Sequence, residues 1–404
     1  MTLALVESLL RFANRLGGNA YRANVLPIYE LTHDARPFTL RSNFAYHLRT
    51  PDFDMRIRTN DFGLREHASL EVLLQHPYKI LVMGDSHTFG YGVNDGERYS
   101  DLLNASLTSQ AISFTSGYAD GFSPIDYVVY LQMFYERLKP DLVVIGFFPE
   151  NDVVNDVRTR RIIRNAKGDI VETKLSGFTI EDGFIAAEHT VQSPFHHAVT
   201  AFKNRLWNTF MVYRVIEEAR NRVRYWRHPE LQNTQLPAFF FGGSVNGEEV
   251  DVTLRAIQQM DRLLKAHGKT LVVCFIPSNF QISSRYDRSI IDRPGYRVRL
   301  EQMAVARSLR EPQTSLSRWF AANGVRYLDP TEEFIRAERD GTKLYFDFDG
   351  HLSPKGHRLM AKLLEEYLVR NQLIPCGCVK PTVVQAVPGG ACRNQVIGYA
   401  ASVN

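Results

Sequence analysis

Cysteine is scarce in this sequence, and its positive and negative charges nearly balance. The 404 residues include 4 cysteines, 48 lysines and arginines and 44 aspartates and glutamates, so the formal net charge is +4 at pH 7. Four cysteines are too few for a disulfide framework. A charge this small gives no indication of a nucleic-acid partner. With 44% hydrophobic and 23% charged residues, the composition is that of a globular protein large enough to bury a core.

Three of the four cysteines lie near the end of the chain, at Cys376, Cys378 and Cys392. Their C-x-C spacing plus one distant cysteine lacks the paired spacing of a zinc module. We therefore expect free thiols in a weakly ordered tail, and no metal site.

Long hydrophobic runs are also absent, since no stretch approaches the roughly 20 apolar residues that span a bilayer. The first residues, MTLALVESLLRFANRL, lack the basic segment of a secretory signal, and Glu7 interrupts their apolar run. Apolar residues recur there at helical spacing, at Leu5, Leu9, Phe12 and Leu16. We expect one amphipathic helix that packs on its own domain rather than on a membrane surface. We also expect a cytoplasmic protein.

Strand and helix patterns alternate along the rest of the chain. Five apolar runs predict strands, at 78–83, 111–115, 141–148, 270–276 and 325–329. Ser-Pro pairs at 123–124 and 353–354 begin two of the predicted helices. This alternation predicts an α/β fold with about five parallel strands and helices on both faces of the sheet. In such folds, binding and catalytic residues lie at the carboxyl ends of the strands.

Reactive residue types follow the predicted strands. They are a serine, a glycine, an amide and an aspartate/histidine pair: Gly84-Asp85-Ser86, Gly121, Asn151, and Asp349 with His351. A serine becomes a nucleophile when an imidazole oriented by a carboxylate takes its proton. Donors aimed at the developing oxyanion stabilise it by roughly 3 kcal/mol each. The set therefore predicts acyl transfer to a serine.

Four motifs in this order resemble those of the SGNH (GDSL) hydrolase superfamily. They are Gly84-Asp85-Ser86, the run 121–124, the pair Asn151-Asp152 and the run 349–357. Two further segments, TNDFGLRE (59–66) and FIPSNFQI (275–282), resemble a bacterial branch of larger GDSL proteins. The resemblance implies a three-layer flavodoxin-like fold that acts on acyl esters, commonly of carbohydrates or lipids, without a cofactor.

The resemblance also implies a role for each motif. Ser86 would be the nucleophile, His351 the base and Asp349 its acid. The backbone N–H groups of Ser86 and Gly121 and the side-chain amide of Asn151 would form the oxyanion hole.

The last motif departs from the usual pattern, in which the aspartate stands three residues before the histidine. Position 348 is Phe, so Asp347 and Asp349 are both candidates for the acid. The Asp-x-His spacing resembles that of GDSL-like polysaccharide O-acetyltransferases and favours Asp349. The third motif departs as well, because Pro149 stands where a glycine is usual.

Three residues beside the catalytic set are candidates for lining the substrate pocket: Asp85, His87 and Asp347. We interpret Asp85 as structural, because an aspartate there can bind turn N–H groups beside the serine. His87 follows the serine where an apolar residue is more common, and a solvated turn histidine is the simpler interpretation. His357 is expected to pack in the core.

The segment 156–249 interrupts the alternation. It begins with a basic run, RTRRIIR (158–164), expected to be a solvated surface, and continues into an aromatic-rich helical stretch at 201–226. We predict a helical insertion after the third strand that caps the pocket. The chain then divides into an N-terminal segment that packs on the core (1–77), the hydrolase domain (78–155 and 250–372), the insertion (156–249) and the tail (373–404).

The sequence predicts a serine esterase that hydrolyses an acyl ester of a small molecule or glycan through an acyl-enzyme. One alternative is an O-acyltransferase, in which a sugar hydroxyl replaces the attacking water. A second alternative is a glycan-binding protein that retains the fold without catalysis. A nucleotide site at Gly90-Tyr91-Gly92 is not expected, because the third glycine of that fingerprint is Asp95 here.

Overall fold

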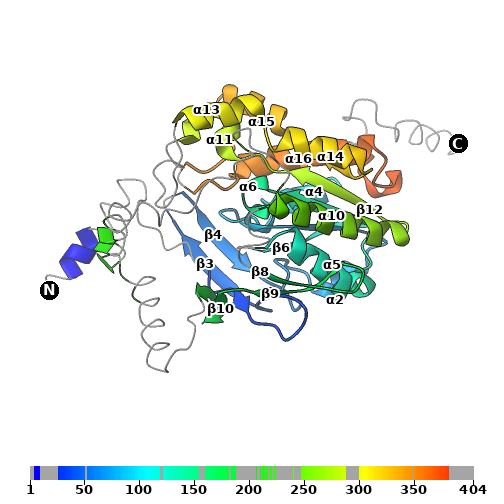
Figure 1. The fold of residues 1–404 in the computed structure, drawn as a ribbon, viewed down its shortest axis with the longest axis horizontal. Helices are drawn as coiled ribbons and strands as arrows, with labels where there is room; N and C mark the ends of the chain where they lie inside the picture. The colour runs from blue at the N-terminus through cyan, green and yellow to red at the C-terminus, as the bar shows by residue number, and fades with distance from the viewer. Residues whose placement is uncertain are drawn as a thin grey trace, which may run out of the picture.

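The computed structural model describes residues 4–9, 26–50, 52–118, 122–153, 160–181, 183–187, 247–287, 300–347 and 349–381, with a few residues between 206 and 240. At its centre lies a five-stranded sheet (Figure 1), formed by β5 (Tyr78–Gly84), β6 (Ala111–Gly117), β7 (Leu142–Phe147), β12 (Thr270–Phe275) and β13 (Arg326–Leu328). All five predicted strands are confirmed, with boundaries that differ by one or two residues.

The strands lie in the order β13-β12-β7-β5-β6, and every pairing is parallel. Numbered along the chain, this is the order 2-1-3-4-5 of flavodoxin-like folds. The predicted α/β fold class is therefore confirmed. In this order the chain reverses direction across the sheet between β5 and β7, and ligands bind at such a switch point, beyond the carboxyl ends of the strands.

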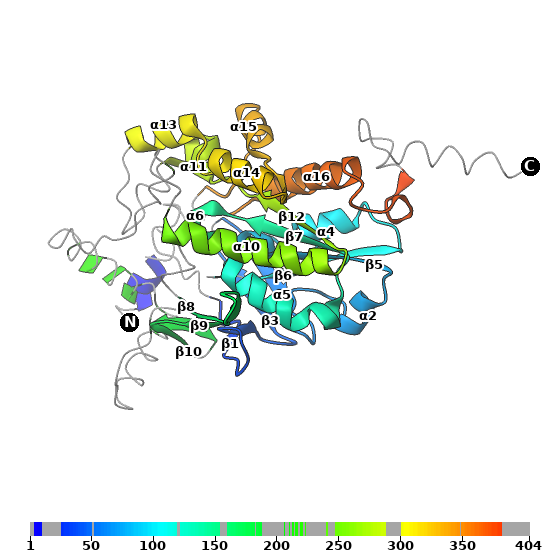
Figure 2. The same cartoon turned by 45° about the vertical axis from the view of Figure 1, so that its right-hand side comes forward.

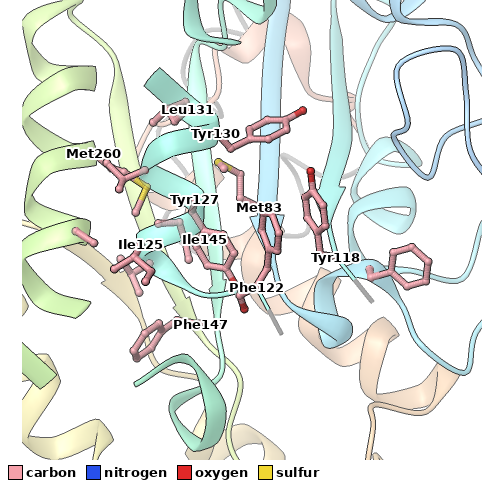
Figure 3. Close-up of a cluster of buried hydrophobic side chains, with 14 of the residues drawn as sticks. Met83, Tyr118, Phe122, Ile125, Tyr127, Tyr130, Leu131, Ile145, Phe147 and Met260 are labelled. Atoms are coloured by element: carbon pink, nitrogen blue, oxygen red, sulfur yellow. Dashed lines mark hydrogen bonds between the residues drawn. The ribbon is translucent and has the colours of Figure 1, made fainter. Parts of the chain in front are cut away.

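Helices cover both faces of the sheet, because successive strand residues point to opposite sides. On one face, alternate strand residues pack against α5 (Pro124–Leu138) and α10 (Glu248–Ala266), which lie side by side in Figure 2. Figure 3 shows part of this core, with Met83 and Ile145 from the sheet facing Tyr127 and Met260 from the two helices. The other face packs against α4 (Tyr99–Asn104) and α16 (Pro354–Arg370).

Shorter elements lie between and after the strands of this sheet. The helices are α3 (Ser86–Phe89), α6 (Pro149–Asp152), α11 (Asn279–Ile282), α13 (Leu300–Leu309), α14 (Gln313–Ala322) and α15 (Thr331–Arg339), with a 3₁₀ turn at η3 (Ser284–Tyr286). Of these, α3 and α6 follow β5 and β7 directly, so both begin at the carboxyl edge of the sheet.

The N-terminal segment packs on the core, as expected, through residues 26–77. It forms the antiparallel pairs β1 (Tyr29–Glu30) with β2 (Thr39–Leu40) and β3 (Ala45–Arg49) with β4 (Asp54–Arg58), followed by α2 (Leu70–Leu74). Ile28, Phe38 and Met55 are fully buried in the same core as the sheet. These short strands were not predicted, since they lack long apolar runs.

The described part of the insertion forms two hairpins, β8 (Arg160–Arg164) with β9 (Ile170–Leu175) and β10 (Phe178–Glu181) with β11 (Phe184–Ala187). The first hairpin packs on α5 and α10. Arg160 Nε lies 3.0 Å from Asp126 Oδ2, and Gln259 hydrogen-bonds both the N–H and the carbonyl of Ile170, at 2.9 and 2.8 Å.

The expectation of a solvated basic run is therefore wrong at Arg160, which is buried and paired. The aromatic-rich stretch 201–226 lies mostly outside the described residues. A cap over the pocket stays a prediction.

The first part of the tail is ordered on the domain. The 3₁₀ turn η4 (Cys376–Cys378) lies beside the end of α4, where the Thr108 N–H donates to the Cys378 carbonyl at 2.9 Å and the Lys380 N–H donates to the Ser106 carbonyl at 2.9 Å. Cys376 is disulfide-bonded, whereas Cys274 and Cys378 are free and buried. The expectation of free thiols is thus wrong at Cys376.

Residues 4–9 are helical, as predicted for the start of the chain. The side chains of Leu5 and Leu9 are 62% and 58% exposed, so the expected packing of this apolar face is wrong at these two residues. Within the described ranges, every helix is too short or too polar to cross a membrane.

Candidate active site

Three glycines stand side by side where β5, β6 and β7 end. Gly84 is opposite Gly117 on one neighbour and opposite Gly146 on the other. A Cβ at Gly84 or at Gly146 would overlap the Thr88 hydroxyl, and a Cβ at Gly117 would overlap the backbone of Phe89. The short helix α3 can therefore lie across the strand ends only because these side chains are absent.

Ser86 is the first residue of α3, and Asp85 is its N-cap. The Asp85 carboxylate accepts a hydrogen bond from the His87 N–H at 3.0 Å, as is typical of an N-cap aspartate. Asp85 is fully buried and Ser86 is 9% exposed. The serine hydroxyl is thus held at the switch point of the sheet.

The structure brings the predicted serine, histidine and aspartate together. His351 Nε2 lies 2.8 Å from Ser86 Oγ, and His351 Nδ1 contacts Asp349 Oδ1. Gly350, between the aspartate and the histidine, has φ +84°, a left-handed conformation that favours glycine. This turn lets the side chains of Asp349 and His351, which are separated by one residue, point toward each other. The Asp349 N–H is in turn held by Asp52 Oδ2, at 2.8 Å.

The other candidate for the acid, Asp347, pairs with a different side chain. The Asp347 carboxylate is exposed and pairs with Lys343 Nζ at 2.7 Å. The geometry therefore favours Asp349 over Asp347 as the partner of His351.

Asn151 lies in α6 and faces α3, the helix that begins with Ser86. Its Nδ2 donates to Asp85 Oδ2 at 2.9 Å, which leaves the second amide hydrogen for another acceptor. Pro149 is the first residue of α6, a position that favours proline, so the departure from glycine does not disturb this helix. The buried Asp152 fixes α6 by accepting hydrogen bonds from the Tyr127 hydroxyl at 3.0 Å and the Phe148 N–H at 2.7 Å.

Burial raises the pKa of the Asp85 carboxyl to about 6, although the Asn151 amide and His351 favour its ionised form. The interpretation of Asp85 as structural agrees with its contacts to Asn151 and to the helix N–H groups. Gly121, the third predicted donor of the oxyanion hole, lies outside the described residues.

His87 is 3% exposed, so the expectation of a solvated histidine is wrong. Its ring centroid lies 4.3 Å from that of Phe148 and 4.8 Å from that of His351. Tyr91 packs against the His351 ring as well, at 4.8 Å. Tyr91 was not predicted to have a role, and its position between two glycines was the only signal in the sequence.

His357 packs in the core, as expected. It is fully buried, its Nδ1 accepts a hydrogen bond from the Tyr99 N–H at 3.2 Å, and its ring stacks on that of Tyr99. Burial lowers the pKa of His357 to about 3, so it stays neutral near pH 7. Elsewhere in the described residues, no cluster of three His, Cys, Asp or Glu side chains could hold a metal ion.

No protein-family model matches this chain, and no curated protein matches it. Several solved structures do. A GDSL-like lipase from Bacteroides thetaiotaomicron is 12% identical with a TM-score of 0.37, over 76% of this chain and 95% of that one.

An acetyl xylan esterase is 14% identical with a TM-score of 0.35, over 72% of this chain and 100% of the other. A psychrotrophic esterase from Pseudoalteromonas sp. is 11% identical with a TM-score of 0.33, over 73% of this chain and 99% of the other. Similarity at this level carries no argument about function, which is argued below from the site itself.

Proposed function

We propose that this protein is a serine esterase of the SGNH type that hydrolyses acyl esters of a carbohydrate or a lipid. The observation that carries the proposal is the chain of contacts from Ser86 Oγ to His351 Nε2, at 2.8 Å, and from His351 Nδ1 to Asp349. A serine, an imidazole and a buried carboxylate in this arrangement form the general apparatus of acyl transfer.

In the proposed reaction, His351 Nε2 takes the Ser86 proton while Ser86 Oγ bonds to the ester carbonyl carbon. The tetrahedral intermediate then collapses, the bond to the alcohol oxygen breaks, and His351 returns the proton to that oxygen. Water attacks the acyl-enzyme in the same way, with His351 taking its proton, and releases the acid and free Ser86. Asp349 stabilises the imidazolium that forms in each half.

The oxyanion needs donors beside Ser86 Oγ. The Ser86 N–H, at the start of α3, and the Asn151 amide hydrogen that does not bind Asp85 supply two of them. The resemblance assigns the third to the Gly121 N–H. Because Asp85 is a buried acceptor, it keeps Asn151 Nδ2, rather than Oδ1, turned toward the nucleophile's helix.

The test is hydrolysis of short-chain and medium-chain p-nitrophenyl esters by the wild-type protein, Ser86→Ala and His351→Ala. Ser113→Ala is a matched control, because Ser113 is also buried but lies within β6. We expect the wild-type protein and the Ser113→Ala control to hydrolyse these esters at similar rates. Both site variants should be slower by about 10⁴-fold or more. A wild-type protein that neither turns over these esters nor forms a fluorophosphonate adduct on Ser86 would contradict the proposal.

Transfer and hydrolysis share the same acyl-enzyme and differ only in the acceptor. Adding a glycan to the assay therefore separates them. An esterase releases free acid at an unchanged rate, whereas an O-acyltransferase forms acylated glycan faster than it releases acid.

A further inference from the structure

The motif TNDFGLRE (59–66) contains an arginine that lies under the loop after the nucleophile's helix. The Arg65 side chain is fully buried. Its Nη1 donates to the carbonyls of Phe89 and Gly90, both at 2.8 Å, and its Nη2 donates to the carbonyl of Val93 at 2.6 Å. The guanidinium also lies over the Phe89 ring, 4.8 Å from its centroid. One side chain thus binds the backbone on both sides of residues 91 and 92.

Tyr91 stands in the middle of this bound segment. Its ring lies 4.8 Å from the His351 imidazole and 5.6 Å from the Phe53 ring. It therefore fills the space between the N-terminal segment and the catalytic base. Movement of this loop would remove one of the two rings, those of Tyr91 and His87, that lie against the His351 imidazole.

The glycines on either side make this path of the backbone possible. Gly90 has φ +81° and caps α3, and Gly92 has φ +94°, so both adopt the left-handed conformation that other residues avoid. A Cβ at Gly92 would overlap the Phe346 ring. The sequence Gly-Tyr-Gly is thus explained by the turn that directs Tyr91 to His351, and not by nucleotide binding.

An arginine suits this position for a chemical reason. The last carbonyls of a helix have no partner within the helix and are costly to bury unpaired. Guanidinium presents five N–H donors in one plane, so it can serve carbonyls from both ends of the loop at once. The remaining Nε donates to Asp95 Oδ1 at 3.2 Å, which balances the buried charge.

We propose that Arg65 is a positioning residue for the catalytic base: it fixes the loop 89–93 and thereby holds the Tyr91 ring against His351. This inference rests on the proposed esterase function. It gives the TNDFGLRE motif, which lies far from the serine in the sequence, a role in catalysis.

The test compares Arg65→Lys with Arg98→Lys. Lysine keeps the charge but offers its donors from one nitrogen, so it cannot bind the three carbonyls together. Arg98 is a matched control because it is also buried, and its guanidinium binds the Arg65 carbonyl and the carboxylates of Asp101 and Glu66. Only its aliphatic stem, which lysine keeps, lies against Gly90 of the loop. We expect Arg65→Lys to lower kcat by about tenfold to hundredfold with KM little changed, and Arg98→Lys to leave kcat close to wild type.

Tyr91→Leu is the second variant, and it tests the same inference if Arg65→Lys fails to fold. It removes the ring but leaves the arginine and its carbonyl partners intact, so we expect a similar loss of kcat. Tyr91→Phe restores the ring and should recover most of that loss. Thermal unfolding and circular dichroism establish that each variant is folded at the assay temperature.

A spectroscopic measurement separates this inference from the esterase proposal. The proton between His351 Nδ1 and Asp349 should give a far-downfield imidazole resonance in the proton NMR spectrum, whether or not the protein turns over esters. We expect it to be sharp in wild type and Arg98→Lys, and to broaden or vanish in Arg65→Lys and Tyr91→Leu.

Two outcomes would overturn the inference. One is a Tyr91→Leu variant that shows the same resonance and the same kcat as wild type. The other is an equal loss of kcat and resonance in both lysine variants, which would mean that the loss does not come from the contacts of Arg65 with the loop 89–93. If wild type lacked esterase activity but showed the expected pattern of resonances, the function would be wrong and the positioning role would stand.

Discussion

Asn151 and Asp85 come from the ends of two adjacent strands and are joined by a hydrogen bond of 2.9 Å from Nδ2 to Oδ2. The contact links the third motif to the residue before Ser86. It leaves the second amide hydrogen of Asn151 available for the proposed oxyanion.

Replacing Asn151 by alanine should remove that donor. We expect kcat to fall by about 100- to 1000-fold with a smaller effect on KM, because the lost hydrogen bond strengthens as charge develops on the oxygen. Steady-state kinetics on a p-nitrophenyl ester measures both constants. A variant with unchanged kcat would show that Asn151 does not stabilise the oxyanion.

The two aspartates near His351 should respond differently to substitution. Asp349→Asn keeps the shape of the side chain but no longer stabilises the imidazolium, and we expect kcat to fall by about 10⁴-fold. Asp347→Asn should leave kcat within about twofold, since this carboxylate is exposed and pairs with Lys343. The opposite ranking of the two variants would make Asp347 the triad acid.

The buried His357 should make the protein less stable in acid. Burial lowers the pKa of His357 from 6.5 to about 3. Between these two pH values the unfolded chain therefore binds a proton at His357 that the folded protein does not bind. The free energy of unfolding is unaffected above about pH 7 and falls as the pH drops below 6.5, by about 2 kcal/mol at pH 5.

His357→Gln removes this titration while keeping an acceptor for the Tyr99 N–H. The difference in the free energy of unfolding between wild type and variant should therefore become smaller from pH 8 to pH 5, as measured by urea unfolding. A difference that stays constant with pH would mean that His357 binds a proton as readily in the folded protein as in the unfolded chain.

Gly117→Ala should destabilise the protein, because the added Cβ would overlap the backbone of Phe89 in α3. We expect a loss of about 1–3 kcal/mol in the free energy of unfolding, together with reduced kcat, since α3 carries Ser86. Gly377→Ala is the control, because a Cβ there meets nothing within 4 Å, and its effect should stay within about 0.5 kcal/mol.

The ion pair between Arg160 and Asp126 should stabilise the attachment of the β8–β9 hairpin to α5. Both side chains are buried, so Arg160→Met leaves an unpaired carboxylate and should cost about 3–5 kcal/mol. Adding Asp126→Asn to that variant should recover part of the loss, because the buried charge is then gone. Additive losses in this double-mutant cycle would show that the two residues do not interact.

Local pattern was sufficient to predict the central fold. The three central strands β5, β7 and β12 are buried on both faces, so each contains a continuous apolar run, and the helices between the strands carry apolar residues at helical spacing. The hairpins of the N-terminal segment and the insertion have no such signal, because their strands are short and half-exposed. Their pairing depends on the core beneath them.

The residues of the site, and the pairing of His351 with Ser86 and Asp349, were predicted from residue types, motif order and spacing, whereas the neighbours that hold them in place were not. The Asp-x-His spacing favoured Asp349 over Asp347, and the turn at Gly350 is the structural feature that directs Asp349 to His351. The roles of Arg65 and Tyr91 depend on contacts between segments that are distant in the chain. Cys376 could not be distinguished from a free thiol, since disulfide formation depends on the distance to its partner.

The sequence by itself determined the five strands and the placement of the serine, amide and histidine at their carboxyl ends. These follow from burial and backbone geometry, which act on neighbouring residues. Tertiary structure alone decided which arginine fixes the loop beside the imidazole, which rings lie against the imidazole, and that His87 is buried. Such contacts depend on how separate segments pack, because a buried charge or ring is stable only where the opposing side chains satisfy it.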